Sequence, residues 1–251
     1  MGKRMKPFLV TTPRTGSTII QSLLYSLSKQ HFGYKGNLDE PFTITELFKA
    51  KYERVDDVVK TTEYQRIGKK WFDNKRDIKL EFINLIGDDH NYMMKLFPID
   101  MEPELLSMME NNYDVICLER RDKIHQALSW VLLWETNIAH YKVDDHRIVT
   151  SLRYNSFHAR EMLRHFKAYK EFKEYYKKPF KTVVYEDFME QGGNEDALIK
   201  LLDLPIENYE PMKMVTKPTP YNNDLENLIV NKEEWLSDKE DLINEIKKIT
   251  Y

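Results

Sequence analysis

The stretch FLVTTPRTGSTIIQSLL, residues 8–24, indicates the fold of the chain around it. Its first five residues are apolar or β-branched and predict a buried strand over residues 8–12. Its last part is a helix-periodic apolar run, which predicts a helix over residues 17–29. A tight turn, residues 13–18, joins the two. A strand followed by a tight turn and a helix is typical of proteins that alternate strands with helices.

The turn carries the groups that hold an anion. Backbone N–H groups at the start of a helix are free to bind a ligand, and the helix dipole adds partial positive charge. Gly16 allows a close approach of the backbone, Arg14 adds a planar charged fork, and Ser17 and Thr18 add hydroxyl donors. Each charge-assisted bond of this kind contributes on the order of 1.5–3 kcal/mol. The alternative interpretation is a Ser/Thr helix cap with a chance arginine.

The anion is not predicted to be an ordinary nucleotide triphosphate. The loop that binds such nucleotides has the pattern G-x-x-x-x-G-K-S/T. Here Thr11 occupies the position of the first glycine, and Ser17 that of the lysine. Without that lysine, the contact to the β- and γ-phosphates is missing. The turn is therefore predicted to hold a phosphate-like group of a different ligand.

The rest of the chain continues the alternation of strands and helices. Short strands separated by helices predict an α/β fold, a three-layer P-loop-like arrangement with a central, mainly parallel sheet flanked by helices, in a single domain of residues 1–251. Ligands bind such sheets at the carboxyl ends of the strands. Further strands are predicted over residues 92–97, 113–118 and 181–185, and helices within 43–87 and over 102–111, 122–139, 150–177, 195–202 and 233–249.

Composition narrows the class of protein. The 251 residues include 38 basic and 41 acidic residues, a net charge of −3 that argues against bulk adhesion to nucleic acid or membrane. One cysteine, Cys117, lies in the predicted strand 113–118, where burial is expected, and it suits a reducing compartment. No signal-peptide pattern and no run of roughly 20 apolar residues is present. These features predict a soluble, cytoplasmic protein; nothing in them indicates the oligomeric state.

A second anion site is predicted in LERRDKIHQALSW, residues 118–130. A strand ends in Arg120 and Arg121, and a helix starting near Asp122 brings Ser129 close to the strand end. An arginine at a strand end and a serine eight residues later are suited to gripping a phosphate. The alternative is a solvated charge cluster at the start of a helix.

Together the two motifs resemble the PAPS-dependent sulfotransferases. In that family a lysine or arginine before Ser/Thr-Gly-Ser/Thr-Ser/Thr holds the 5′-phosphosulfate, and a later Arg with a Ser eight residues on holds the 3′-phosphate. The details are similar to the bacterial carbohydrate branch of the trehalose 2-sulfotransferase type, in which RRD followed by Q-A-V/L-S-W recurs. A third similarity is VYEDF, residues 184–188. The resemblance is dense over residues 7–40 and 113–135 and thin over 45–90 and after 190.

The resemblance implies a co-substrate and the residues that bind it. PAPS would donate a sulfuryl group to a hydroxyl of a carbohydrate or small-molecule acceptor, and adenosine 3′,5′-bisphosphate would be released. No metal is required in the family. The eight-residue spacing to Ser129 selects Arg121, which leaves Arg120 spare or paired with Glu119. The residues implied to bind PAPS are Arg14, Thr15, Gly16, Ser17, Thr18, Arg121, Ser129, Tyr185 near the adenine, and Lys217 over the 3′-phosphate.

The resemblance also implies catalytic residues. Arg14 would stabilise the charge that develops on the transferring group. Glu40 matches the glutamate that serves as the base in the trehalose-type branch, with Asp39 as its neighbouring alternative. Lys95, on the predicted strand 92–97, would face the sulfuryl group or the acceptor. The alternatives are a surface acid for Glu40, a surface lysine for Lys95 and a core tyrosine for Tyr185.

Two other functions compete with this prediction. One is a nucleotide kinase or NTPase of the same broad fold, which the missing lysine and glycine oppose. The other is a non-catalytic nucleotide-binding relative that kept the fold. Retention of Arg14, Ser129 and a candidate base argues against it.

Overall fold

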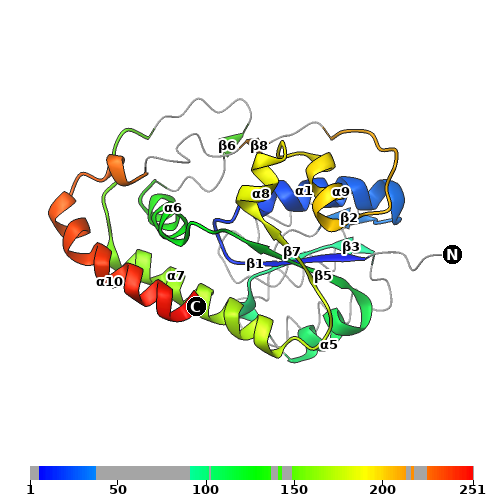
Figure 1. Ribbon diagram of the computed structural model, residues 1–251, viewed down its shortest axis with the longest axis horizontal. Coiled ribbons are helices and arrows are strands. Elements are labelled where there is room, and N and C mark those ends of the chain that lie inside the picture. The colour runs from blue at the N-terminus through cyan, green and yellow to red at the C-terminus, as the bar shows by residue number, and fades with distance from the viewer. Residues whose placement is uncertain are drawn as a thin grey trace, which may run out of the picture.

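Figure 1 shows the computed structural model of the chain. It describes residues 6–37, 91–101, 103–136, 141–142, 149–212, 216–217 and 225–250, with the backbone alone at 36–37, 100, 141–142 and 216–217. The helices predicted within residues 43–87 lie outside these ranges, and so does Glu40.

Four parallel strands form the central sheet. Their order is β4 (Lys95–Leu96), β1 (Pro7–Thr11), β5 (Asp114–Glu119) and β7 (Lys181–Val184). Every neighbouring pair in this sheet is parallel. The predicted α/β class, with a central parallel sheet flanked by helices, is therefore confirmed.

The two faces of the sheet are both buried, because successive side chains of a strand point to opposite faces. Phe8 and Val10 pack into one core cluster with Cys117. Leu9, between them, packs into the opposite cluster with Ile116. Burial on both faces explains why β1 is apolar without alternation. Cys117 is fully buried, as predicted for a strand residue.

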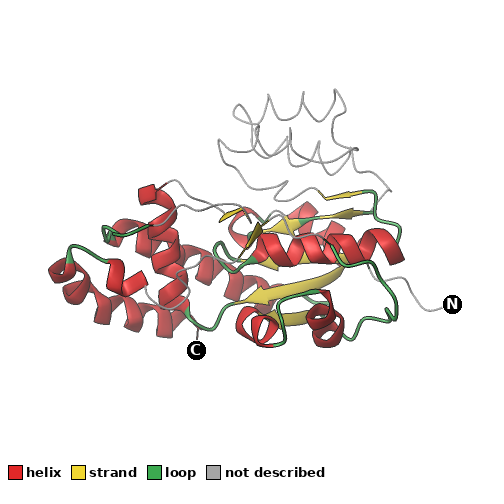
Figure 2. Ribbon diagram, turned by 90° about the horizontal axis from the view of Figure 1, so that it is seen from above, coloured by secondary structure: helices red, strands yellow, loops and turns green. Residues whose placement is uncertain are grey.

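Helices cover both faces, as Figures 1 and 2 show. On one face lie α1 (Ser17–His31), α8 (Tyr185–Glu190) and α9 (Glu195–Leu202), and on the other α5 (Pro103–Asn112) and α7 (Ser156–Tyr175). A third core cluster joins α7 to α6 (Lys123–Thr136), α10 (Lys232–Thr250) and the short helix η2 (Leu225–Leu228). None of the helices in the described ranges is long and apolar enough to cross a membrane.

Three predicted elements differ from the structure. The single strand over residues 92–97 is two strands, because β3 (Tyr92–Met93) pairs with β2 (Gly36–Asn37) whereas β4 pairs with β1. The long helix predicted from residue 150 begins only at Ser156, where the side chain of Asn155 caps it. Tyr185, predicted to end a strand, is the first residue of α8.

Two short strands form a separate sheet outside the central one. β6 (Tyr141–Lys142) and β8 (Thr216–Lys217) pair antiparallel, with Tyr141 opposite Lys217. η1 (Pro98–Asp100) begins one residue after β4, where Pro98 has no N–H to donate to a strand ladder.

Candidate functional site

The register of the sheet brings the two predicted motifs to one edge. Thr11, the last residue of β1, lies opposite Leu118, and Glu119, the last residue of β5, lies opposite Val184. Parallel strands end on the same side of a sheet, so the chain segments that follow β1, β5 and β7 meet there. These segments carry residues 12–16, 120–122 and Tyr185.

The turn after β1 has two residues in the left-handed region of backbone conformation. Arg14 and Gly16 both have positive φ, at 62° and 77°. The carbonyl of Gly16 accepts hydrogen bonds from the N–H groups of Ile19 and Ile20, which starts α1. Helix geometry leaves the N–H groups of Ser17 and Thr18 without intrahelical acceptors, and they stand at the positive end of a four-turn helix.

Arg14 and Ser129 are in direct contact. Nε of Arg14 donates a hydrogen bond to Oγ of Ser129 over 3.0 Å, although 115 positions separate the two residues. Ser129 lies in the second turn of α6 and is buried. The two motifs predicted to bind anions are therefore in contact with each other.

Two residues of the second motif hold the backbone of the first. Nη1 of Arg120 donates to the carbonyl of Arg14 at 3.2 Å. The side-chain amide of Gln126 donates to the carbonyl of Pro13 at 2.5 Å and to the hydroxyl of Thr12 at 2.7 Å. These bonds hold the carbonyls of Pro13 and Arg14 toward α6 and the segment after β5.

Tyr185 packs against the glycine of the turn. A Cβ added to Gly16 would lie 2.2 Å from Cε2 of Tyr185, so only glycine fits under this ring. The guanidinium of Arg120 lies over the same ring, 5.3 Å from its centroid. Tyr185 thus contacts the turn and the arginine that holds it, and it is buried.

Lys95 enters the site from β4. It is fully buried, and Nζ donates to Oγ of Ser17 at 3.3 Å. This places an ammonium group beside the first residue of α1. The hydroxyl of Thr15 is directed inward instead, toward Oγ1 of Thr11 at 2.6 Å and the carbonyl of Thr12 at 3.0 Å. Only the backbone of Thr15 is left for a ligand.

Arg121 lies on the surface beside this cluster. Its side chain is 58% exposed and forms an ion pair with Asp187 of α8. Its backbone N–H, like that of Asp122, donates to the carboxylate of Glu186. The structure therefore brings Arg14, Ser17, Lys95, Ser129 and Tyr185 together, whereas the guanidinium of Arg121 is turned toward α8.

The predicted residues at the edge of the site are placed only in part. Thr18 lies in the first turn of α1 and is partly exposed. The backbone of Lys217 lies in β8, and its side chain is outside the description, as is the whole of Glu40.

Burial and two nearby arginines lower the pKa of His125, which lies on α6. Burial, followed by the guanidinium of Arg120 and, more weakly, that of Arg14, lowers the pKa of His125 to about 4; Asp122 and Glu186 oppose the shift. The His125 imidazole is therefore neutral at pH 7. It lies in the first turn of α6, one turn before Ser129.

Sequence reasoning missed three residues of this site. The eight-residue spacing to Ser129 selected Arg121 and gave Arg120 no role in binding. Neither Gln126 nor His125 received a role. The signal available was helical spacing, because residues 125 and 126 precede Ser129 by four and three positions and so share its face. Which arginine of the doublet turns inward was not readable from spacing alone.

Comparison with protein-family models and with curated proteins finds no match to this chain.

Proposed function

We propose that this protein is a PAPS-dependent sulfotransferase that moves a sulfuryl group to an acceptor hydroxyl. The observation that carries the proposal is the contact of Arg14 with Ser129, which joins the two anion-binding motifs of that family in one site. The four-stranded parallel sheet flanked by helices is compatible with the P-loop-like arrangement of those enzymes.

The proposed ligand has negative charge at two ends. The N–H groups of Ser17 and Thr18 and the guanidinium of Arg14 are assigned to the 5′-phosphosulfate. Ser129 is assigned to the 3′-phosphate. Arg121 is assigned to the same phosphate, once its ion pair with Asp187 has broken. From the family resemblance, Tyr185 is assigned a place near the adenine and Lys217 a place over the 3′-phosphate. A triphosphate would lack the lysine that normally contacts its β- and γ-phosphates.

The reaction needs stabilisation of negative charge more than covalent chemistry. The acceptor oxygen forms a bond to sulfur while the bond from sulfur to the phosphate oxygen breaks, and the electron pair stays on the nucleotide. Arg14 and Lys95 are the cations placed to neutralise that charge. Because Lys95 is fully buried, its ammonium acts in a water-poor setting in which electrostatic interactions are strong.

The acceptor hydroxyl must lose its proton to a base within hydrogen-bond reach. Glu40 is proposed for this role from the family resemblance. The change Glu40→Gln is expected to keep nucleotide binding and remove most turnover. Unchanged turnover would exclude Glu40 from the mechanism and leave the rest of the proposal standing.

The test is transfer of radiolabelled sulfate from PAPS to a panel of acceptors that includes glycans, lipids and small alcohols. The expected result is labelled product with at least one acceptor class, and none with Arg14→Ala. Protein that binds the nucleotide but labels no acceptor would favour a non-catalytic relative. Stabilisation by ATP–Mg alone, without any effect of adenosine 3′,5′-bisphosphate, would favour a kinase or NTPase.

A further inference from the structure

A line of ring-bearing side chains leads from Lys95 to the surface of the protein. This aromatic strip consists of Phe97, Trp130, Trp134, Phe157, His158 and His165. At its inner end, Nζ of Lys95 lies over the ring of Phe97, 5.8 Å from the centroid, and donates to Ser17 of α1. The proposed function gives no role to these rings.

Ring contacts connect the inner end of the strip to α6. His165 of α7 meets Phe97 edge-on, with 6.1 Å between the ring centroids, and meets Trp130 at 5.7 Å. Trp130 in turn meets Trp134, one turn later on α6, at 5.9 Å. Trp130 also follows Ser129 directly in the chain. The strip therefore adjoins the candidate site at two places.

The exposure of the rings increases toward the outer end of the strip. The exposed fraction is 7% for Phe97, 53% for Trp134 and 68% for Phe157. Trp134 stacks on His158 with 5.1 Å between the centroids, and Phe157 packs against the edge of the same imidazole. Exposed aromatic rings that adjoin a candidate catalytic site are typical of a surface that binds a substrate.

Polar groups along the strip favour a hydroxylated ligand over a hydrocarbon. Within the described part of the chain, Nε1 of Trp130 is buried and has no hydrogen-bond partner, whereas a buried indole N–H usually has one. An indole N–H only donates, so it requires an acceptor such as an oxygen. His158 and Glu161 form a polar pair at 2.9 Å beside Trp134. A sugar ring fits this combination, because its C–H faces pack on aromatic rings and its hydroxyls accept and donate.

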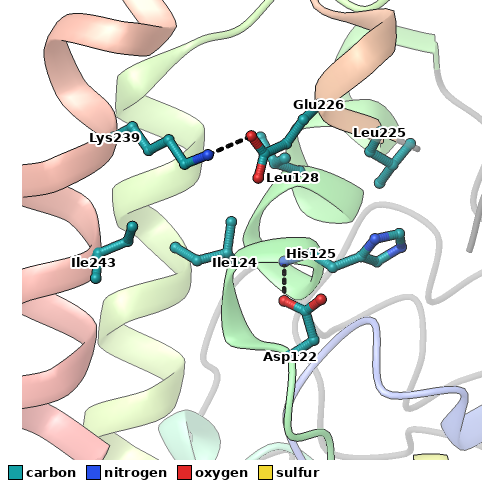
Figure 3. A pocket seen from close by; sticks show the side chains of 8 residues that line it. All are labelled: Asp122, Ile124, His125, Leu128, Leu225, Glu226, Lys239 and Ile243. Atoms are coloured by element: carbon teal, nitrogen blue, oxygen red, sulfur yellow. Dashed lines mark hydrogen bonds and ion pairs between the residues drawn. The ribbon is translucent and has the colours of Figure 1, made fainter. Parts of the chain in front are cut away.

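A cavity on a different face of α6 is less suited to the acceptor. Figure 3 shows this cavity, of about 260 Å³, between α6, η2 and α10. Two of its lining residues form an ion pair, in which Lys239 donates to Glu226 at 2.6 Å. Neither Arg14 nor Lys95 is among the residues that line it. A hydroxyl bound there would not lie beside the cations that the proposed reaction uses.

We propose that the aromatic strip binds the acceptor, and that the acceptor is a saccharide of more than one sugar unit. This inference rests on the proposed function. The unit that carries the reacting hydroxyl lies at the inner end, beside Lys95, and a further unit packs on Trp134 and Phe157. Because the rings of His165 and Trp130 separate Phe97 from Trp134, a single sugar unit would not contact both ends of the strip.

The experiment is calorimetric titration of the full chain, in the presence of adenosine 3′,5′-bisphosphate, with maltotetraose, cellotetraose and chitotetraose. At least one tetrasaccharide is expected to bind, and to bind more tightly than the corresponding monosaccharide. Trp134→Ala should weaken this binding about tenfold, because the stacking surface of an exposed ring is lost. Tyr175→Ala is the matched control and should behave as the wild type, since it removes an exposed ring of α7 that is not part of the strip.

The outcomes separate this inference from the proposed function. If the bisphosphate binds but no tetrasaccharide does, or if Trp134→Ala binds the tetrasaccharide as the wild type does, the inference is overturned and the proposed function stands. Binding of 4-nitrophenol or 1-octanol in place of every tetrasaccharide, with a loss in Trp134→Ala, would overturn the assignment to a saccharide. If the bisphosphate binds to none of the proteins, the proposed function falls, and the role of the strip in binding the acceptor falls with it.

A second measurement covers the case in which Trp134→Ala does not fold. The indole N–H signals of the wild type are then followed by NMR during addition of the tetrasaccharides. At least one signal is expected to shift, because Trp130 gains an acceptor and Trp134 a stacked ring. Unchanged indole signals with all three tetrasaccharides would overturn the inference.

Discussion

Nε of Arg14 lies 3.0 Å from Oγ of Ser129, and this hydrogen bond joins the turn after β1 to the helix after β5. Arg120 and Gln126 strengthen the same junction by holding the carbonyls of Arg14 and Pro13. Hydrogen bonds of three side chains therefore join the two motifs, which stand apart in the sequence. The proposed ligand, which has two anionic ends, would contact both motifs.

Gly16→Ala is expected to destabilise the protein and remove nucleotide binding. The added Cβ would lie 2.2 Å from Tyr185, and the residue keeps a φ of +77°. Gly33→Ala is the matched control, because Gly33 has a φ of +74° and nothing within 4 Å of the added Cβ. A positive φ costs an alanine roughly 1–2 kcal/mol at either position. Thermal melts should therefore show a clearly larger loss for Gly16→Ala, and equal losses would refute the close packing of Tyr185.

The neighbouring arginines are expected to behave differently when each is replaced by alanine. Arg120→Ala removes a buried group that bonds to Arg14 and stacks on Tyr185, so it should lower the free energy of unfolding by about 1–3 kcal/mol and weaken nucleotide binding. Arg121→Ala removes an exposed side chain, so the melting temperature should stay unchanged while affinity for the bisphosphate falls. Chemical denaturation and calorimetry separate these effects. A loss of stability in Arg121→Ala as large as that in Arg120→Ala would contradict the assignment.

Asp187→Asn is expected to raise the affinity for adenosine 3′,5′-bisphosphate by a few-fold. Asp187 forms an ion pair with Arg121 in the free protein, and this pairing competes with binding of the 3′-phosphate. Glu190→Gln removes the same charge from the same helix. If only the local field mattered, both changes would give the same gain, and direct competition would be excluded.

The free protein should lose stability as the pH falls from about 6.5 toward 4. The pKa of His125 is lowered to about 4 in the folded chain, against about 6.5 in the unfolded chain. Between these values the unfolded chain binds the extra proton, so protonation favours unfolding. Urea denaturation at pH 7, 5.5 and 4.5 should show a smaller loss for His125→Gln than for wild type or His31→Gln. Identical losses would mean that His125 is not held neutral by its surroundings.

The central parallel sheet could be predicted from the sequence, because buried parallel strands such as β1 are short, apolar and bounded by turns. The division of residues 92–97 into β3 and β4 could not, since the register with two different partners depends on tertiary pairing. The helix predicted over residues 150–177 starts later in the structure than predicted, because Leu152 pairs with Ile229 in an isolated bridge.

The grouping of the candidate site residues could also be predicted only in part. Arg14, Gly16 and Ser129 follow from local chemistry and from spacing. The inward turn of Arg120 and the outward turn of Arg121 depend on Tyr185 and Asp187, which lie more than sixty positions later. No local pattern carries that information.

The most direct test of the central claim is calorimetric binding of adenosine 3′,5′-bisphosphate, compared with ATP–Mg, to wild type, Arg14→Ala and Ser129→Ala. We expect one bisphosphate per chain for the wild type, an affinity about 10- to 100-fold weaker in Arg14→Ala, a smaller loss in Ser129→Ala, and weaker binding of ATP–Mg throughout. Tighter binding of ATP–Mg, or bisphosphate binding that neither substitution alters, would contradict the account.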